Sequence, residues 1–112
     1  MNVPHITTHV LDTGAGRPAA EVAVVLYQND GGSWRELART ATDSDGRAKD
    51  LGPERLAPGR YRLNFGTGDY YAGVGTATFF PEVDVVFEVT GDEHYHVPLL
   101  LSPFAYSTYR GS

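Results

Sequence analysis

Apolar and polar residues alternate with a period of two over most of the chain. Ile6, Thr8 and Val10 form the more apolar set of the first such segment, and side chains two positions apart point to the same face of a strand. Similar alternation is found at 22–27, 61–65 and 83–89, and turn-forming clusters lie at 12–18, 29–32 and 43–46. The pattern predicts an all-β antiparallel sandwich of seven to eight strands. One short helix is expected near 69–72, where Gly73 and Gly75 limit its length.

Two of these strands place histidines on the face opposite the predicted core. Alternation from Ile6 puts His5, Thr7, His9 and Leu11 together on the outer face of the first strand. Alternation through 94–102 puts Tyr95, Val97, Leu99 and Leu101 on an apolar face, and His94, His96, Pro98, Leu100 and Ser102 on the other. Because 99–101 is apolar on both faces, this strand is expected to be covered on both sides. The histidine face is therefore predicted to be an interface between subunits, with polar groups embedded in it.

Composition limits the classes of function. The chain of 112 residues is 41% apolar, which suits a single domain spanning 1–112. Nine basic residues against 14 acidic ones give a net charge of −5, so binding to nucleic acid or to an anionic membrane is not expected. Cysteine is absent, which excludes disulfides. A cytoplasmic location is expected, since no apolar leader or membrane-spanning run is visible.

Three segments together carry a resemblance to a known family. They are 8–12 with 16–19, then 42–47, and finally 94–112, which ends in Tyr-Arg-Gly-Ser. The chain resembles the transthyretin-related proteins, in particular the 5-hydroxyisourate hydrolases, over essentially its whole length. The resemblance implies a prealbumin-like sandwich assembled as a homotetramer, a dimer of dimers, with active sites where the dimers meet. It also implies hydrolytic opening of the 5-hydroxyisourate ring in urate catabolism.

The same resemblance implies roles for individual residues. His9 and His96 match the catalytic histidines and would jointly activate water and deliver a proton, a task suited to a side chain with a pKa of about 6.5. Arg47 would hold the carbonyl oxygens and the developing oxyanion. The residues expected to bind substrate are Tyr109, Arg110, Gly111 and Ser112. No metal or organic cofactor is expected, because amide hydrolysis needs neither electrons nor a carbanion sink.

Other interpretations of the same residues stay open at this point. His5, His9, His94 and His96 could form a zinc site, since imidazole is a common ligand. The cluster 43–46 resembles the start of a calcium loop but lacks the later ligands, so a turn is favoured. A hormone-carrier-like protein that binds a small ligand without turnover is the main alternative function. A structural sandwich module without a ligand is the third.

Overall fold

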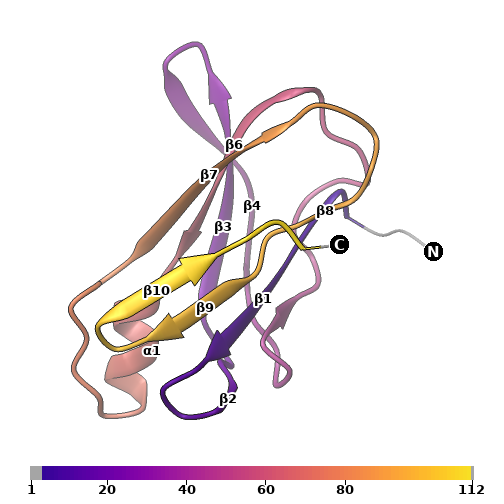
Figure 1. Ribbon diagram of the computed structural model, residues 1–112. Helices are drawn as coiled ribbons and strands as arrows, with labels where there is room; N and C mark the ends of the chain where they lie inside the picture. Colours follow the sequence, from indigo (N-terminus) through magenta and orange to yellow (C-terminus); the bar gives the residue numbers. More distant parts are fainter. Residues whose placement is uncertain (1–3, 112) are drawn as a thin grey trace.

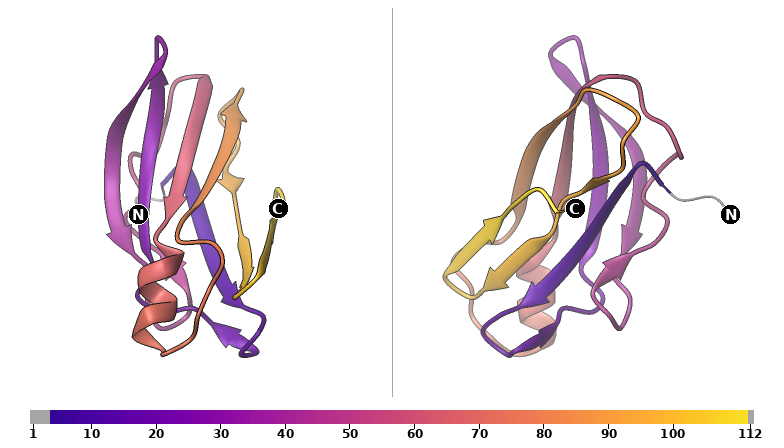
Figure 2. Two further views of the ribbon diagram at one scale, coloured as in Figure 1. Left: turned by 90° about the vertical axis from the view of Figure 1, so that its left-hand side faces the viewer. Right: turned by 45° about the vertical axis from the view of Figure 1, so that its right-hand side comes forward.

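The fold of the chain is described from a computed structural model, which covers residues 4–111. Two β-sheets stack face to face, and a single short helix lies at one end of the stack (Figures 1 and 2). The first sheet has the order β4-β3-β6-β7. Its strands are β3 (Ala23–Asp30), β4 (Ser33–Ala41), β6 (Gly59–Phe65) and β7 (Val83–Val89).

The second sheet carries the histidine face. Its main path is β10-β9-β1-β2, and β5 and β8 also pair with β1. Its strands are β1 (Ile6–Asp12), β2 (Arg17–Pro18), β5 (Arg47–Ala48), β8 (Tyr95–His96), β9 (Leu99–Ser102) and β10 (Ala105–Thr108). The helix α1 (Thr67–Gly73) connects β6 to β7. The sandwich with one short helix is thus confirmed; ten strands are described, three of which have only two residues.

The period of two decides which side chains fill the core. In β1, Ile6, Thr8 and Val10 are buried, while the residues between them are half-buried on the outer face. The core joins both sheets through fully buried side chains such as Val24, Leu26, Tyr61, Leu63, Phe65, Leu99 and Leu101. Each apolar side chain of this size contributes about 1.5–3 kcal/mol when it leaves water. The predicted inner faces of β1 and of 95–101 are therefore correct.

Strand direction in the second sheet differs from the antiparallel expectation. β1 runs parallel to β8 and to β9, whereas β10 pairs with β9 in the antiparallel sense. The segment 94–102 is also interrupted between β8 and β9, where Pro98 has no N–H to donate to a neighbouring strand. Alternation within a strand does not depend on its direction, so the sequence pattern could not distinguish these pairings.

The helix is attached to the second sheet through a buried hydrogen bond. The Tyr70 hydroxyl donates to Asp12 Oδ2 over 2.7 Å. Burial, and then the carboxylate of Asp12, raise the pKa of Tyr70 to about 12, so the phenol stays protonated and can donate. Within 4–111, no helix has the length and apolar character needed to cross a membrane.

Candidate active site

Pairing between three strands brings the predicted catalytic residues to one face of the second sheet. His9 on β1 is the register partner of Arg47 on β5, and Thr7 on β1 is the register partner of His96 on β8. Partners in register project their side chains to the same side of a sheet. Since Thr7 and His9 are two residues apart on one strand, all four side chains share the outer face. Two histidines and an arginine of one chain therefore lie on the same face of the sheet.

The turn before β5 positions His9. Asp43 Oδ1 accepts hydrogen bonds from the backbone N–H groups of Asp45 and Arg47, at 2.9 and 3.1 Å. Gly46 has a positive φ of 79°, and a side-chain carbon there would overlap the carbonyl oxygen of Val10. Only glycine fits this close approach. The residues 43–46 thus form a turn, as predicted, that packs against β1.

This turn also determines the tautomer of His9. The distance from His9 Nε2 to the carbonyl oxygen of Asp45 is 2.7 Å. A carbonyl oxygen only accepts, so Nε2 carries the hydrogen and the neutral ring keeps its lone pair on Nδ1. His9 is therefore oriented by the backbone with one nitrogen available as a base.

His96 is half-buried, with Arg47, His94 and His9 close to its ring. Its Nδ1 lies 2.8 Å from the hydroxyl oxygen of Thr7. Burial lowers the pKa of His96 below its usual 6.5, and the charges of Arg47, His94 and His9 lower it further. The ring is consequently neutral at pH 7, which is the state required of a general base.

The C-terminal segment 109–111, called the tail below, packs against His96. The N–H of Gly111 donates to the carbonyl oxygen of His96 over 2.8 Å, and the two residues form an isolated antiparallel bridge. A side-chain carbon at Gly111 would lie only 2.6 Å from Cδ2 of the His96 ring. The tail is therefore in direct contact with the imidazole, and glycine at this position allows that contact.

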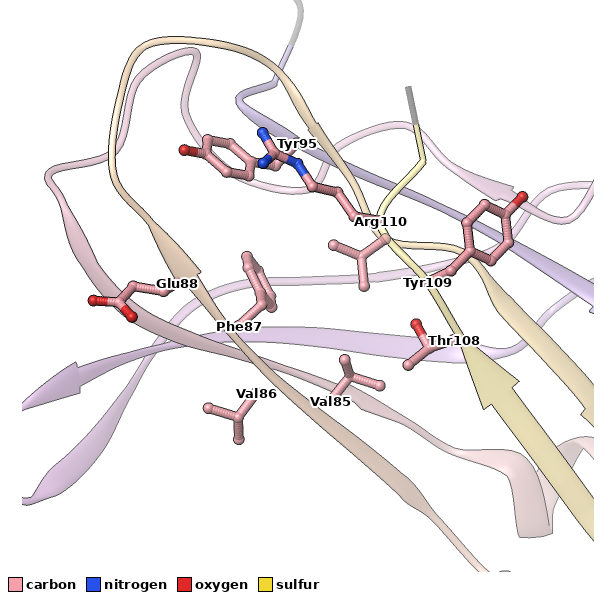
Figure 3. Close-up of a pocket in the computed structure, with 9 residues that line it drawn as sticks. Val85, Val86, Phe87, Glu88, Tyr95, Thr108, Tyr109 and Arg110 are labelled. Carbon is pink, nitrogen blue, oxygen red and sulfur yellow. The ribbon is translucent and has the colours of Figure 1, made fainter.

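The other predicted substrate-binding residues are distributed differently. Arg110 lies over the ring of Tyr95, with its guanidinium carbon 4.7 Å from the ring centroid, and it forms a 3.6 Å ion pair with Glu93. Arg110 and Tyr109 both line a pocket of about 330 Å³ beside β7, β8 and the C-terminal segment (Figure 3). In this single chain Arg110 is not brought to His9 and His96. Ser112 lies outside the described residues.

His5 corrects one prediction about the histidine face. Its ring is only 3% exposed and does not share the outer face with His9. Nε2 donates to the carbonyl oxygen of Glu93 over 2.9 Å, and Nδ1 accepts from the N–H of Leu56 over 2.8 Å. The alternation failed here because His5 precedes the first residue of β1, where the backbone bends. His5 is a structural residue.

The four-histidine zinc alternative finds no support in this arrangement. His5 is engaged in the core, and no group of three or more histidine or acidic side chains is placed for metal binding between residues 4 and 111. His94 is exposed and instead contacts Thr7. The contacts of the Thr7 hydroxyl with His94 and His96 were not predicted from the sequence. The position of Thr7, two residues before His9, nevertheless indicated that it lies on the same face.

The fold and this outer-face site define a transthyretin-like β-sandwich that carries two histidines beside an arginine. The model of the HIUase/Transthyretin family matches residues 6–111. The chain belongs to this family.

The similar proteins include both 5-hydroxyisourate hydrolases and a transthyretin. The 5-hydroxyisourate hydrolase of Salmonella dublin is 50% identical over 109 residues, covering 96% of this chain and 80% of the relative. The solved structure of Klebsiella pneumoniae 5-hydroxyisourate hydrolase has a TM-score of 0.85 at 36% identity, covering 96% of this chain and 98% of that one. Sea bream transthyretin in complex with thyroxine has a TM-score of 0.90 at 34% identity, covering 95% and 93%. Since the backbone resembles hydrolase and carrier alike, the side chains of the site have to decide between them.

Proposed function

We propose that this protein is a 5-hydroxyisourate hydrolase, with residues 1–112 as a single transthyretin-like hydrolase domain. It converts 5-hydroxyisourate to 2-oxo-4-hydroxy-4-carboxy-5-ureidoimidazoline in urate degradation. The observation that carries the proposal is the convergence of His9, His96 and Arg47 on one sheet face, with the tail packed on His96. A ligand carrier has no need of two imidazoles with an arginine beside them.

Ring opening requires an activated water, a stabilised oxyanion and a proton for the leaving nitrogen. The water oxygen attacks the ring carbonyl carbon while its proton passes to an imidazole lone pair, on Nδ1 of His9 or on His96. The guanidinium of Arg47 stabilises the negative charge that forms on the carbonyl oxygen. The carbon–nitrogen bond then breaks, and an imidazolium gives its proton to the nitrogen. His9 and His96 share these two proton transfers.

The lowered pKa of His96 supports its part in water activation. A base must be neutral before it accepts a proton, and burial together with the charges of Arg47, His94 and His9 favours the neutral ring. Tyr109, Arg110, Gly111 and Ser112 are proposed to bind the substrate. Within the described residues, Gly111 is the member of this set that contacts His96.

A homotetramer, built as a dimer of dimers, is proposed to complete the site. Leu11 on β1 and Leu100 on β9 are register partners that lie half-buried on the same outer face as His9. A second pair of subunits placed on this face would remove both leucines from water and exclude solvent from His9 and His96. A cytoplasmic location stays a prediction.

The test is turnover of freshly generated 5-hydroxyisourate, followed through the loss of its ultraviolet absorbance. His9→Ala and His96→Ala should each lower kcat/KM by about 10²–10⁴-fold, which corresponds to ~3–5 kcal/mol of barrier. Circular dichroism and sedimentation should show unchanged fold and assembly. Wild-type turnover in either variant would contradict the assignment of that histidine.

The alternative is a small-ligand carrier. Its support is the backbone similarity to sea bream transthyretin, whose structure is described in complex with thyroxine. A carrier would bind an aromatic ligand saturably and leave 5-hydroxyisourate to decay at its uncatalysed rate. The same absorbance assay therefore separates the two functions.

A further inference from the structure

A threonine hydroxyl joins His96 to a second, exposed histidine. Thr7 Oγ1 lies 2.8 Å from Nδ1 of His96 and 2.8 Å from Nε2 of His94. The geometry follows from the parallel pairing of β1 with β8, which sets Thr7 beside His96. His94 lies just before β8, and its 2.8 Å contact with the Thr7 hydroxyl places its ring on the same side. Their ring centroids are 6.5 Å apart, with the hydroxyl between them.

The hydroxyl has one hydrogen and two lone pairs, so it cannot donate to both rings at once. When Thr7 donates to His94 Nε2, it accepts the hydrogen of His96 Nδ1, and the neutral His96 ring keeps its lone pair on Nε2. When Thr7 donates to His96 Nδ1, it accepts from His94 Nε2–H, and His96 then carries its hydrogen on Nε2. The protonation of His94 and the tautomer of His96 are therefore coupled through one hydroxyl.

We propose that Thr7 and His94 form a proton relay that sets the tautomer of His96 and exchanges its proton with solvent. The proposal rests on the proposed function, for which it adds two positioning residues. His94 is exposed and can exchange protons with bulk water, while His96 is half-buried beneath the tail.

The relay balances for one catalytic cycle. Neutral His96 takes the water proton on Nε2, its Nδ1–H moves to Thr7 Oγ1, and the hydroxyl hydrogen of Thr7 moves to Nε2 of His94. Threonine loses one O–H bond and gains another, so it ends as a neutral hydroxyl, and the positive charge moves to His94. His96 is left neutral with its hydrogen on Nε2. When the leaving nitrogen takes this hydrogen, His94 returns its proton to Thr7 Oγ1 and the hydroxyl hydrogen of Thr7 moves back to Nδ1 of His96. The ring is therefore never left as an imidazolate, and the starting state is restored.

The surroundings of His96 favour proton transfer from His96 through Thr7 to His94. Burial, and then Arg47, His94 and His9, oppose a lasting positive charge on the His96 ring. His94 lies at the exposed end of this chain of hydrogen bonds, in contact with solvent. An excess proton therefore moves outward through Thr7.

The tautomer is measured first, by ¹⁵N NMR of the ring nitrogens of His96 in the labelled full chain. His94→Ala and Thr7→Val should change the ratio of the Nδ1–H and Nε2–H forms. Thr7→Ser, which keeps a hydroxyl, should preserve the wild-type ratio. Thr8→Val is the matched control, because the Thr8 hydroxyl faces the core and donates to the carbonyl oxygen of Val97. Identical ring shifts for His96 in all four variants would overturn the relay.

Kinetics test the use of the relay in turnover. Thr7→Val and His94→Ala should lower kcat by about 10- to 100-fold, the cost that the loss of an orienting partner has for metal-ligating imidazoles, and leave KM within a factor of about two. Free imidazole in the assay should restore activity to His94→Ala in proportion to its concentration, but not to Thr7→Val. Full kcat in both variants, with an active wild type, would overturn the relay alone. Absence of wild-type turnover would overturn the proposed function instead.

Discussion

Gly111→Ala tests the contact between the tail and His96 most directly. The added carbon would lie 2.6 Å from Cδ2 of the ring, whereas ordinary contacts are 3.4–4 Å. Relief requires a displacement of about 1 Å, either of the imidazole or of the tail. Moving the ring weakens its hydrogen bond to Thr7, and moving the tail breaks the bond from the Gly111 N–H to the His96 carbonyl. Each bond contributes about 1 kcal/mol, so the two responses have similar costs, and each of them separates the tail from the ring.

A misplacement of about 1 Å in a catalytic group costs on the order of 10²-fold in rate, or ~2.7 kcal/mol of barrier. The free energy of unfolding should fall by less than ~1 kcal/mol, because the tail lies at the periphery of the sandwich. The assay is kcat/KM for 5-hydroxyisourate, together with the midpoint of urea denaturation.

Gly73→Ala is the matched control for this substitution. A side-chain carbon at Gly73, the last residue of α1, meets no atom within 4 Å. Its kcat/KM should equal that of the wild type, and the helix should gain up to about 1 kcal/mol. Wild-type activity in Gly111→Ala would refute the argument that the tail holds His96 in its working position.

Three further perturbations address the core, the assembly and the charge state of the site. His5→Ala should lower the free energy of unfolding by about 2–4 kcal/mol, because a buried ring and its two hydrogen bonds are lost. The kcat of the folded protein should be unchanged, and a large loss of kcat would place His5 in the chemistry. Leu100→Asp should prevent tetramer formation, as measured by sedimentation, and should abolish turnover as well, since an unpaired charge is costly in a buried interface. A fully active monomer would refute a site shared between subunits. NMR titration of His96 should give a midpoint below 6.5. Arg47→Met should raise this midpoint by removing a positive charge, but not back to 6.5, because burial is the larger cause of the lowered pKa. A midpoint above 6.5 in the wild type would contradict the neutral base.

Several features of the fold and the site were predictable because they depend on local order in the chain. Alternation along a strand assigns every second side chain to the same face, whatever the strand pairs with. The core positions Ile6 and Val10 and the outward direction of His9 and His96 followed from it. The same rule failed at His5, where the backbone bends before β1 begins and the alternation no longer applies.

The sequence by itself thus determined the sandwich class, the faces of its strands and the residue types available for proton transfer. Only the tertiary structure decided that β1 runs parallel to β8, that Thr7 lies between His94 and His96, and that Arg110 stacks over Tyr95 instead of approaching them. The physical reason is the range of the interactions. Face alternation is set by each residue's own backbone, whereas register and direction come from hydrogen bonds between segments almost 90 residues apart along the chain.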